Sequence, residues 1–547
     1  MTPWNQNYDP VGFWPLSTLL ASLPIVVLFY LLAFRRVGAA WSAAGGALAA
    51  LLIAVVVFGM PLPLAGASFL YGVAFGLVKI AWIVFSAVFL YDIAVASGAF
   101  EIMKDSVAAI SADRRLQALI IAFSFGAFIE GAAGFGAPVA ISAAFMVGLG
   151  FQPFYAAALC LIANTAPVAW GALGTPVHTL AAVTALPEAD LNAMIGRILP
   201  FTSIIVPFWL VRTMVPWKET FAVLPAILVT GVFFAIPQFY WSNYQDSNLV
   251  DIVAALVSLV AMVILLRLWK PREIWRFPDE AVPAAKSSTS KGAVLRAWMP
   301  FVILSVFVFL WGLPSVKKAL NVVTPIFPVP ALHQGVARVA PVVEGVVPEN
   351  ALFDFNWLSA TGTGVFLAAV VSGLALGLSP RKLAETFLMT AHRMRMPLVA
   401  IACMLGLGFV TRYSGVDAVL GLACTRTGIL YPFFGTFLGW LGVALTGSDT
   451  SSNALFGSLQ RITAEQLGFD PVLMAAANSS GGVMGKMVDA QSIVVATAAT
   501  RQVGNEGRIF RFVLWHSIVL GAIVGLIVMA YAFLFPDLVP HGLTFPE

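Results

Sequence analysis

Four ionisable residues stand in otherwise apolar parts of the sequence: Glu130, Asp449, Lys486 and Asp489. An ionisable side chain at membrane depth is costly, and where one occurs it usually serves transport, proton transfer or ligand binding. A buried carboxyl group favours its protonated form, so it can carry a proton. We expect Asp449 to be the first candidate for that role and Glu130 the second. Lys486 could bind an anion, or it could simply pair with Asp489.

These residues lie in segments that interrupt regular helices. The stretches 128–140, "FIEGAAGFGAPVA", and 446–457, "TGSDTSSNALFG", are rich in glycine and polar residues, as are 160–179, "CLIANTAPVAWGALGTPVHT", and 476–492, "AANSSGGVMGKMVDAQS". Irregular backbone at membrane depth is tolerated where it is buried or lines a cavity. Half-helix N-termini present N–H groups and a positive dipole end, which suit a carboxylate. Four such breaks predict one binding site.

The residues that we expect to bind the ligand carry donors, a positive charge or a free backbone within these breaks. They are Gly134, Asn164, Thr165, Ser451, Asn453, Ser480, Gly481, Lys486, Gln491 and Tyr71. Two alternatives stay open for them. Small and hydroxyl residues in membrane helices often serve only close helix packing. Tyr71 could equally belong to an interfacial belt or pack against a neighbour.

The composition determines which elements must position this site. The hydrophobic fraction is 60%, the charged fraction 10% and the mean hydropathy +0.93. A soluble domain has about 25% charged residues. The net charge of +4 gives no sign of nucleic-acid binding, and the three cysteines have no metal-ligand spacing. No phosphate-binding loop is present, so neither a soluble enzyme nor a cofactor is expected.

The predicted fold is an all-α polytopic membrane protein of about 12 transmembrane helices, because each apolar run is long enough to cross a bilayer. Two further segments, 116–150 and 428–467, have broken centres and predict re-entrant hairpins, while 154–181 and 472–499 predict broken helices. The spans are expected near 12–33, 38–58, 68–95, 154–181, 195–212, 220–239, 249–268, 298–313, 357–378, 396–412, 472–499 and 512–533.

Basic residues in short loops mark the cytoplasmic side. Arg35 and Arg36 follow the first span, and the long loop near 267–296 is rich in Lys and Arg. One assignment of the membrane sides to the loops puts every strong basic cluster inside. It requires that both hairpins return to the side from which they start. That assignment predicts periplasmic N- and C-termini and an external loop of roughly 40 residues after Pro314.

An internal repeat supports this topology. "LGFQP" at 149–153 recurs as "LGFDP" at 467–471, an offset of 318 residues that also superposes the two hairpins. We predict a first repeat at 10–215, two linking helices and a basic cytoplasmic loop at 216–297, and a second repeat at 298–535. The two repeats would have inverted topology, a common plan of secondary transporters with the site at the repeat interface.

The sequence resembles the lactate permease family in "EGAAGFGAPVAI" (130–141), "LCLIANTAPVAWGALGTP" (159–176), "FFGTFLGWLGVALTGSDTSSNALFG" (433–457) and "SSGGVMGKMVDAQSI" (479–493). The resemblance covers nearly the whole chain. It implies a bacterial inner-membrane transporter of L-lactate, D-lactate and glycolate, coupled to protons and without a cofactor. The plan is also similar to the wider ion-transporter superfamily, which implies a transport core moving against a scaffold, as in an elevator mechanism.

Proton coupling has a physical reason, because an inside-negative potential opposes anion entry by about 2.3 kcal/mol per 100 mV. Three alternatives remain open from the residues alone. Ser and Thr oxygens could ligate Na⁺ in a carrier of another small organic anion. The same loops could form an anion-channel filter. Asp449 and Lys486 could also act as an acid–base pair in a membrane enzyme.

Overall fold

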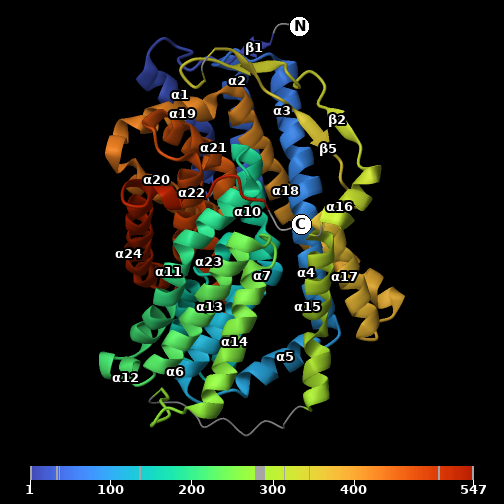
Figure 1. The fold of residues 1–547 in the computed structure, drawn as a ribbon, viewed down its shortest axis with the longest axis vertical. Helices are drawn as coiled ribbons and strands as arrows, with labels where there is room; N and C mark the ends of the chain where they lie inside the picture. Colours follow the sequence, from blue (N-terminus) through green and yellow to red (C-terminus); the bar gives the residue numbers. More distant parts are fainter. Residues whose placement is uncertain are drawn as a thin grey trace.

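Most of the long apolar runs form helices that lie roughly along the long axis of the molecule (Figure 1). The computed structural model describes residues 3–31, 35, 37–134, 137–277, 290–312, 314–343, 345–502 and 505–544. Within these ranges, 10 helices are long and apolar enough to cross a membrane, or up to 11 if a pair bent by 63° counts as one span. The chain is therefore a multi-pass, mainly helical membrane protein, as predicted.

Four of the 12 predicted spans are absent from these 10 helices: those at 12–33 and 357–378, which are shorter, and those at 154–181 and 472–499, which are interrupted. The 10 helices include the first arms of both predicted hairpins, within Arg114–Ala132 and Val416–Ala444. The first arm, at 19 residues, is longer than a half-helix was expected to be. The spans predicted at 12–33 and 357–378 are shorter helices of 16 and 15 residues.

Helices of the first half begin with α1 (Trp14–Phe29), α2 (Ala39–Val56) and α3 (Leu62–Phe75). The helix α3 continues through the π-helical turn η2 (Gly76–Ala81) into α4 (Trp82–Ala96), so one 35-residue span replaces the prediction at 68–95. It begins earlier because Gly59 turns the chain with φ +68° and a proline lies in the first turn, where its missing N–H costs nothing. The short helix α5 (Ala99–Ala108) follows.

Each predicted hairpin consists of two helical arms that pack on each other. The first arm joins α6 (Arg114–Gln117), η3 (Ala118–Phe125) and α7 (Gly126–Ala133), and the second is α8 (Ala137–Gly148). The later hairpin consists of α20 (Tyr431–Thr446) and α21 (Asp449–Leu467), joined at Gly447 with φ +73°. Residues 135–136, at the tip of the first hairpin, lie outside the described ranges.

The predicted broken helices are also interrupted. The first consists of α9 (Pro153–Ala163), η4 (Val168–Trp170) and α10 (Gly171–Thr184), with the 63° bend between its halves. The second consists of α22 (Pro471–Gly485), η7 (Lys486–Val488) and α23 (Ala490–Ala499), separated at Asp489, whose backbone is extended.

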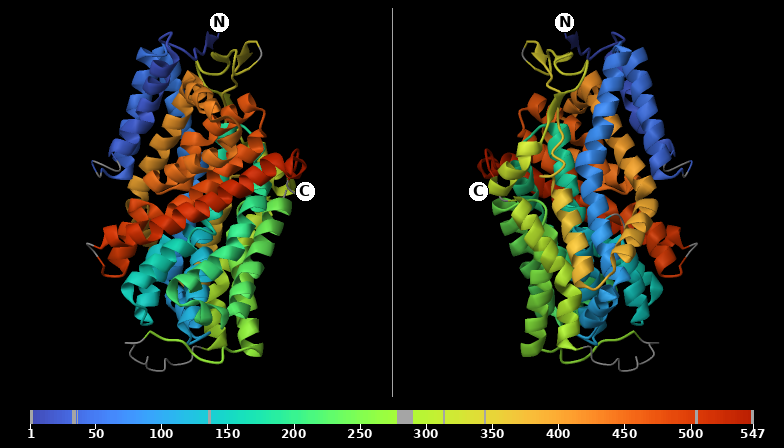
Figure 2. Two further views of the ribbon diagram at one scale, coloured as in Figure 1. Left: turned by 90° about the vertical axis from the view of Figure 1, so that its left-hand side faces the viewer. Right: turned by 90° about the vertical axis from the view of Figure 1, so that its right-hand side faces the viewer.

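The remaining helices fall into two packed groups. In one group, α18 (Pro380–Ser414) packs on α2, α3 and α4, while α17 (Thr361–Ala375) packs on α4 and on α15 (Lys291–Gly312). In the other, α11 (Glu188–Met214) packs on α13 (Leu224–Tyr244) and α22, and α24 (Glu506–Phe533) crosses α20 and α22 obliquely (Figure 2). The other elements are α12 (Trp217–Phe221), α14 (Val250–Leu268), α16 (Pro314–Leu320), α19 (Val416–Cys424), η5 (Asn321–Val323), η6 (Thr425–Leu430) and η8 (Pro536–Leu538).

The all-α prediction omitted five short strands, which form a strand cap at one end of the molecule (Figure 1). They are β1 (Trp4–Asn5), β2 (Ile326–Pro328), β3 (Val336–Arg338), β4 (Val347–Pro348) and β5 (Leu352–Asp354). The strand β3 pairs in parallel with β1 and antiparallel with β4, while β2 and β5 form a separate antiparallel pair. The strand cap therefore joins the N-terminus to the segment predicted as an external loop.

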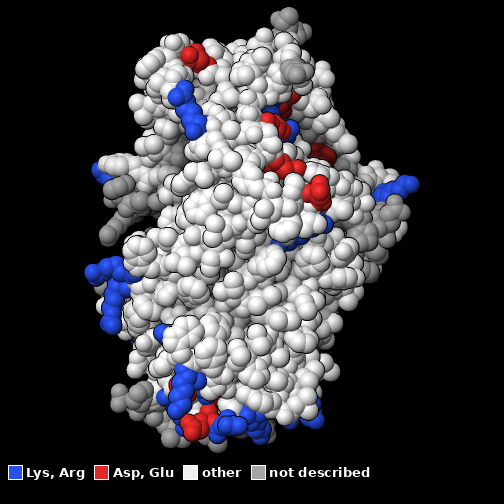
Figure 3. All heavy atoms as spheres, turned by 60° about the vertical axis from the view of Figure 1, so that its left-hand side comes forward, with Lys and Arg blue, Asp and Glu red and all other residues white. Residues whose placement is uncertain are grey.

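Ion pairs fix the strand cap to the helices. The Arg338 and Arg412 guanidinium groups lie 2.5 and 3.0 Å from the two carboxylate oxygens of Glu349. Lys79 pairs with Asp354 at 2.8 Å. At the opposite end, Lys and Arg side chains gather on the face shown in Figure 3.

Candidate functional site

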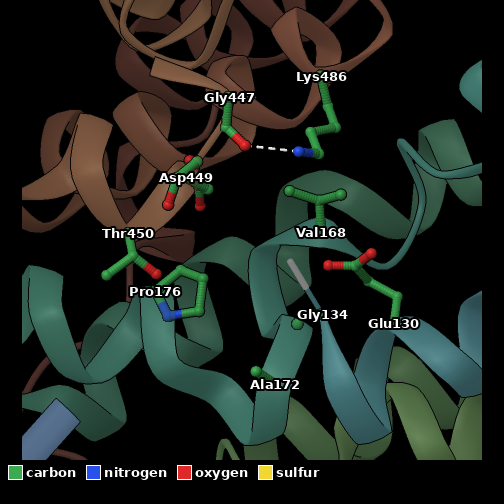
Figure 4. A pocket seen from close by; sticks show the side chains of 11 residues that line it. Glu130, Gly134, Val168, Ala172, Pro176, Gly447, Asp449, Thr450 and Lys486 are labelled. Carbon is green, nitrogen blue, oxygen red and sulfur yellow. Dashed lines mark hydrogen bonds between the residues drawn. The ribbon is translucent and has the colours of Figure 1, made fainter. Parts of the chain in front are cut away.

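A pocket of about 340 Å³, counted with its open mouth, lies where the two hairpin tips meet the two broken helices (Figure 4). Lys486, Asp449 and Glu130 reach it from three sides. The lining residues are Glu130, Gly134, Val168, Gly171, Ala172, Pro176, Gly447, Ser448, Asp449, Thr450 and Lys486. All four interrupted segments singled out in the sequence therefore contribute to one pocket.

The backbone at the start of α10 is unwound and left-handed. Ala172, Leu173 and Gly174 have φ values of +46°, +59° and +73°. This conformation costs an L-residue with a side chain roughly 1–2 kcal/mol, so packing around the site must hold it in place. Regular helix resumes after Gly174, and Thr175 Oγ1 donates a hydrogen bond to Ala172 O at 2.6 Å. The N-terminus of this helix therefore begins at the pocket.

A second helix N-terminus lies at the same pocket. Asp449 is the first residue of α21, and the Ser448 side chain caps the helix by accepting a hydrogen bond from Ser451 N at 3.3 Å. Ser448, Asp449 and Thr450 all line the pocket. Two converging N-termini present positive dipole ends and free N–H groups, which suit an anionic ligand.

Lys486 supplies a formal positive charge to the pocket. Its Nζ donates a hydrogen bond to Gly447 O at 2.5 Å and lies 3.2 Å from Asp489 Oδ2. The predicted pairing with Asp489 is therefore present, and Lys486 also lines the pocket. An ammonium group has three donors, so these two partners leave one donor for a ligand.

Asp449 is held by polar side chains on one of its two oxygens. Its Oδ2 accepts hydrogen bonds from Ser479 Oγ at 2.5 Å and from Asn453 Nδ2 at 3.4 Å. Asn453 Nδ2 also donates to Pro176 O at 3.1 Å, which ties α21 to α10. Asp449 Oδ1 has no hydrogen-bond partner among the described residues, and a Cβ on Gly482 would collide with it.

Glu130 has a less polar environment. It is 4% exposed, and its Oε2 has no hydrogen-bond partner in the described part of the chain. A Cβ on Gly171 would lie 2.5 Å from Glu130 Oε1, so a larger residue there would displace this carboxyl group. The Asn164 side chain lies close to Glu130. Two residues that were predicted to act at the site thus lie side by side, with Glu130 in the pocket lining and Asn164 behind it.

Asp251 packs against Gly131, the residue after Glu130, and was not predicted from the sequence. It stands in the first turn of α14, is 1% exposed, and neither of its carboxylate oxygens has a hydrogen-bond partner in the described ranges. An aspartate in a first helical turn is usually a favourable partner of the helix dipole. An aspartate at this position therefore gives no functional signal in the sequence. Only its burial in the structure makes Asp251 a candidate functional residue.

Several residues predicted to bind the ligand do not line the pocket. Thr165 Oγ1 donates to Ile162 O at 2.8 Å, and Ser480 is buried with its Oγ unpartnered within the described part. The Tyr71 hydroxyl donates to Leu352 O of the strand cap at 2.9 Å, away from the pocket.

Two further residues predicted to bind the ligand have structural roles. A Cβ on Gly481 would collide with the Thr436 carbonyl, so this glycine serves the contact of α22 with α20. Ser451 donates its backbone N–H to the side chain of Ser448, which caps α21. The side chain of Gln491 lies outside the described part of the structure.

The polar network behind Asp449 was only partly visible in the sequence. Asn478 Nδ2 donates to Asn453 Oδ1 at 2.9 Å, and Gln460 Nε2 donates to Asn478 Oδ1 at 3.2 Å. The Tyr431 hydroxyl completes the chain by donating to Gln460 Oε1 at 2.7 Å. No group of three or more His, Cys, Asp or Glu side chains suited to a metal ion occurs among the described residues.

Comparison with known proteins gives a consistent result over the whole chain. A family model described as L-lactate permease matches residues 17–535. The chain is 46% identical to glycolate permease GlcA of Escherichia coli K12, covering 98% of this chain and 99% of that protein. It is 44% identical to the L-lactate permease of Salmonella typhimurium, covering 99% and 100%, and 42% identical to that of Bacillus subtilis, covering 98% and 100%. Among solved structures, the Alcanivorax borkumensis YdaH transporter aligns with a TM-score of 0.45 at 13% identity, covering 84% and 86%.

Proposed function

The chain belongs to the L-lactate permease family, and from this premise we propose that it imports L-lactate, D-lactate and glycolate together with a proton. The family is one of permeases, so the chain is a transporter and the alternative of a membrane enzyme falls away. We place the chain in a bacterial inner membrane. The pocket is the main support for this proposal. In it, the ammonium group of Lys486 and two helix N-termini lie beside buried carboxyl groups.

The substrate carboxylate binds at the N-termini of α10 and α21 and to the free donor of Lys486. Charge-assisted hydrogen bonds of this kind are about twice as strong as neutral ones. Thr450, whose side chain lines the pocket, is suited to the substrate's 2-hydroxyl group. A monocarboxylate without this hydroxyl would leave that partner unpaired, and sites built for a hydroxyl discriminate strongly against such analogues.

The proton is carried on a buried carboxyl group at the pocket, with Asp449 and Glu130 as the two lining candidates. Protonation removes a negative charge beside the incoming carboxylate, so proton and substrate favour each other's binding. One proton and one monoanion together carry no net charge, so the membrane potential no longer opposes uptake.

The proposed topology has the strand cap outside and the basic end inside. Lys and Arg side chains at the lower end of Figure 3 support this orientation. The pairing of β1 with β3 supports a periplasmic N-terminus on the side of the external loop. The C-terminal tail contacts the start of α22, where His541 Nε2 lies 2.9 Å from Asp470 Oδ2, which supports a periplasmic C-terminus.

We further propose that residues 10–215 and 298–535 are inverted repeats joined by 216–297, each with a re-entrant hairpin and a broken helix. The meeting of both hairpin tips at one pocket supports this arrangement. The two packed groups of helices support an elevator movement, in which the group containing α11, α13, α20, α22 and α24 carries the pocket past the group containing α2, α3, α17 and α18.

Counterflow in proteoliposomes tests the proposed function. Vesicles loaded with unlabelled L-lactate take up labelled L-lactate, and a panel of 2-hydroxy acids and their 3-hydroxy or unsubstituted analogues competes. We expect L-lactate, D-lactate and glycolate to compete, the analogues to compete weakly, and a pH gradient to drive accumulation when choline replaces Na⁺. Accumulation that needs Na⁺, or large currents without accumulation, would refute the proposal.

A further inference from the structure

The helices α10 and α21 both begin at the pocket and run away from it side by side in the same direction. Asn453 Nδ2 of α21 donates a hydrogen bond to Pro176 O of α10 at 3.1 Å, and the two residues are 277 positions apart in the chain. About two turns further on, Arg461 Nη1 donates to Thr184 O, and the separation is again 277 positions. This constant separation shows that the two helices are parallel and in register, so their N-termini lie level with each other at the pocket.

A glycine lies midway between these two hydrogen bonds. A Cβ on Gly457 would lie 2.8 Å from Val183 Cγ2 and 2.9 Å from Leu180 Cδ1. Because no side chain is present at this position, α10 can approach α21 closely along its whole length. The pair therefore joins the first broken helix to the second arm of the later hairpin.

The parallel arrangement places two like dipole ends next to each other. Each helix N-terminus carries the equivalent of about half a positive charge, so the two ends repel each other when no anion is bound. An anion at both ends lowers this repulsion and is attracted by both dipoles. The affinity for a carboxylate therefore depends on how firmly the two N-termini are held together.

The partners of the Asn453 amide fix its orientation. The carbonyl of Pro176 can only accept a hydrogen bond, so the amide nitrogen must face it. Asn453 Oδ1 accepts from Asn478 Nδ2 at 2.9 Å, and Asn478 Oδ1 accepts from Gln460 Nε2 at 3.2 Å. Gln460 Nε2 also donates to a second backbone carbonyl, Gly435 O, at 2.6 Å. The two carbonyls thus set the same direction of donation from both ends of this chain of amides.

We propose that Asn453 is a positioning residue, which clamps the N-termini of α10 and α21 side by side and thereby sets the affinity for the substrate's carboxylate. The sequence predicted Asn453 as a ligand of the substrate. In the structure it is 0% exposed and is not among the residues that line the pocket, so it acts through the two helices rather than by contact. The inference rests on the proposed function, because it requires that the carboxylate binds at these two N-termini.

The second hydrogen of the Asn453 amide points to Asp449 Oδ2, at a distance of 3.4 Å between the heavy atoms. Asp449 also accepts a hydrogen bond from Ser479 and stands at the positive end of α21, and both features favour its ionised form. Glu130 lies in the last turn of α7, near the negative end of that helix, and its Oε2 has no partner in the described ranges. Glu130 is therefore the lining carboxyl group that binds a proton more readily, which reverses the order expected from the sequence.

The Asn453→Leu variant tests the clamp in proteoliposomes, since leucine keeps the branched shape of the side chain and has no donor. We expect the half-saturating L-lactate concentration in counterflow to rise about tenfold, because the carboxylate loses the aligned dipole of one N-terminus. The maximal rate per folded transporter should stay within about twofold of wild type, because the clamp acts on binding. Glycolate should lose affinity by the same factor, because both substrates present the same carboxylate.

A matched variant on the same helix separates the clamp from a general loss of packing. Thr463 is 0% exposed, and its Oγ1 donates to Gly421 O of α19 at 3.0 Å. Thr463→Val removes this bond without removing one to α10, so Tm should fall while the half-saturating concentration stays within about twofold of wild type.

Asn453→Asp provides the test if the leucine variant does not fold. The neutral form of the new carboxyl group can donate one hydrogen bond, and its ionised form can donate none. The half-saturating L-lactate concentration of this variant, divided by that of wild type at the same pH, should therefore grow as the pH rises.

Two results would overturn the clamp. One is a wild-type half-saturating concentration in a folded Asn453→Leu protein, or at every pH in Asn453→Asp. The other is a loss of affinity that differs clearly between L-lactate and glycolate, which would place Asn453 against the substrate itself. Wild type separates these failures from that of the proposed function: if it shows no saturable counterflow of L-lactate, the proposed function fails first.

Discussion

Replacing Lys486 by glutamine tests the assignment of the pocket cation most fully. The ammonium group donates to Gly447 O at 2.5 Å and lies 3.2 Å from Asp489 Oδ2, so one donor remains, and we propose that it binds the ligand. A hydrogen bond between a charged donor and a carboxylate contributes about 1.5–3 kcal/mol. Each 1.4 kcal/mol corresponds to a factor of about ten in a dissociation constant. Lys486→Gln should therefore raise the half-saturating L-lactate concentration roughly 10- to 100-fold.

The same substitution also destabilises the protein, and this effect must be separated from binding. Removing one partner of a buried ion pair costs about 3–5 kcal/mol, because the other charge is left unpaired. Asp489 is 0% exposed, and its Oδ1 accepts a hydrogen bond from Ser492 N at 2.7 Å. The double variant Lys486→Gln/Asp489→Asn removes both charges and should recover most of the lost thermal stability.

The comparison of the two variants uses counterflow for affinity and thermal unfolding in detergent for stability. The single variant should show a lower Tm and weak binding, while the double variant should show a recovered Tm and equally weak binding. If the double variant recovers both the wild-type Tm and the wild-type affinity, Lys486 acts only by neutralising Asp489, and our account of the pocket is wrong. Our account of the pocket would also be refuted if the half-saturating concentration of the single variant stayed within about twofold of wild type. Such a change corresponds to less than about 0.5 kcal/mol of binding free energy.

Three further predictions have defined outcomes. Asp449→Asn should retain accumulation driven by a pH gradient at saturating L-lactate, whereas Glu130→Gln should abolish it; the opposite pattern in uptake assays would return the proton to Asp449. Gly131→Ala places a methyl group 2.7 Å from Asp251 Cβ and should lower the free energy of unfolding by about 1–3 kcal/mol through overpacking; the control Gly66→Ala, where no atom lies within 4 Å, should not lower Tm. Burial raises the pKa of Glu349, but Arg412 and Arg338 lower it more, so that the pKa lies below its ordinary value. The stability that Glu349 contributes is therefore present above about pH 4.3 and is lost as the pH falls through the lowered pKa; a Glu349→Gln variant should show a lower Tm at neutral pH without that acid-dependent loss.

The interrupted helices could be predicted because their cause is local. Glycine, proline and hydroxyl residues within long apolar runs identify the breaks at 160–179 and 476–492, and the structure has a bend or an extended residue in each. The identity of the ionisable lining residues followed from the same argument, since Glu130, Asp449 and Lys486 are rare in such segments and all three reach the pocket.

The residues that sequence reasoning misplaced depend on packing between distant segments. Tyr71 has the right chemistry, but its helix turns the hydroxyl toward Leu352 of the strand cap, 281 positions away. Gly481 was expected to offer its backbone to a ligand, yet the close approach of the Thr436 carbonyl accounts for it. The strands themselves contain two or three residues each, too few for an alternating pattern to be visible in the sequence.

The central claim is that one proton crosses with each 2-hydroxymonocarboxylate. Its most direct test is to record the pH inside proteoliposomes while labelled L-lactate enters through the protein without any imposed gradient, after subtracting protein-free vesicles. Our account predicts that the lumen acidifies by one proton for each L-lactate, that no current accompanies the flux, and that Na⁺ is not required. Uptake of labelled L-lactate that leaves the lumen pH unchanged, or that carries net negative charge, would contradict it.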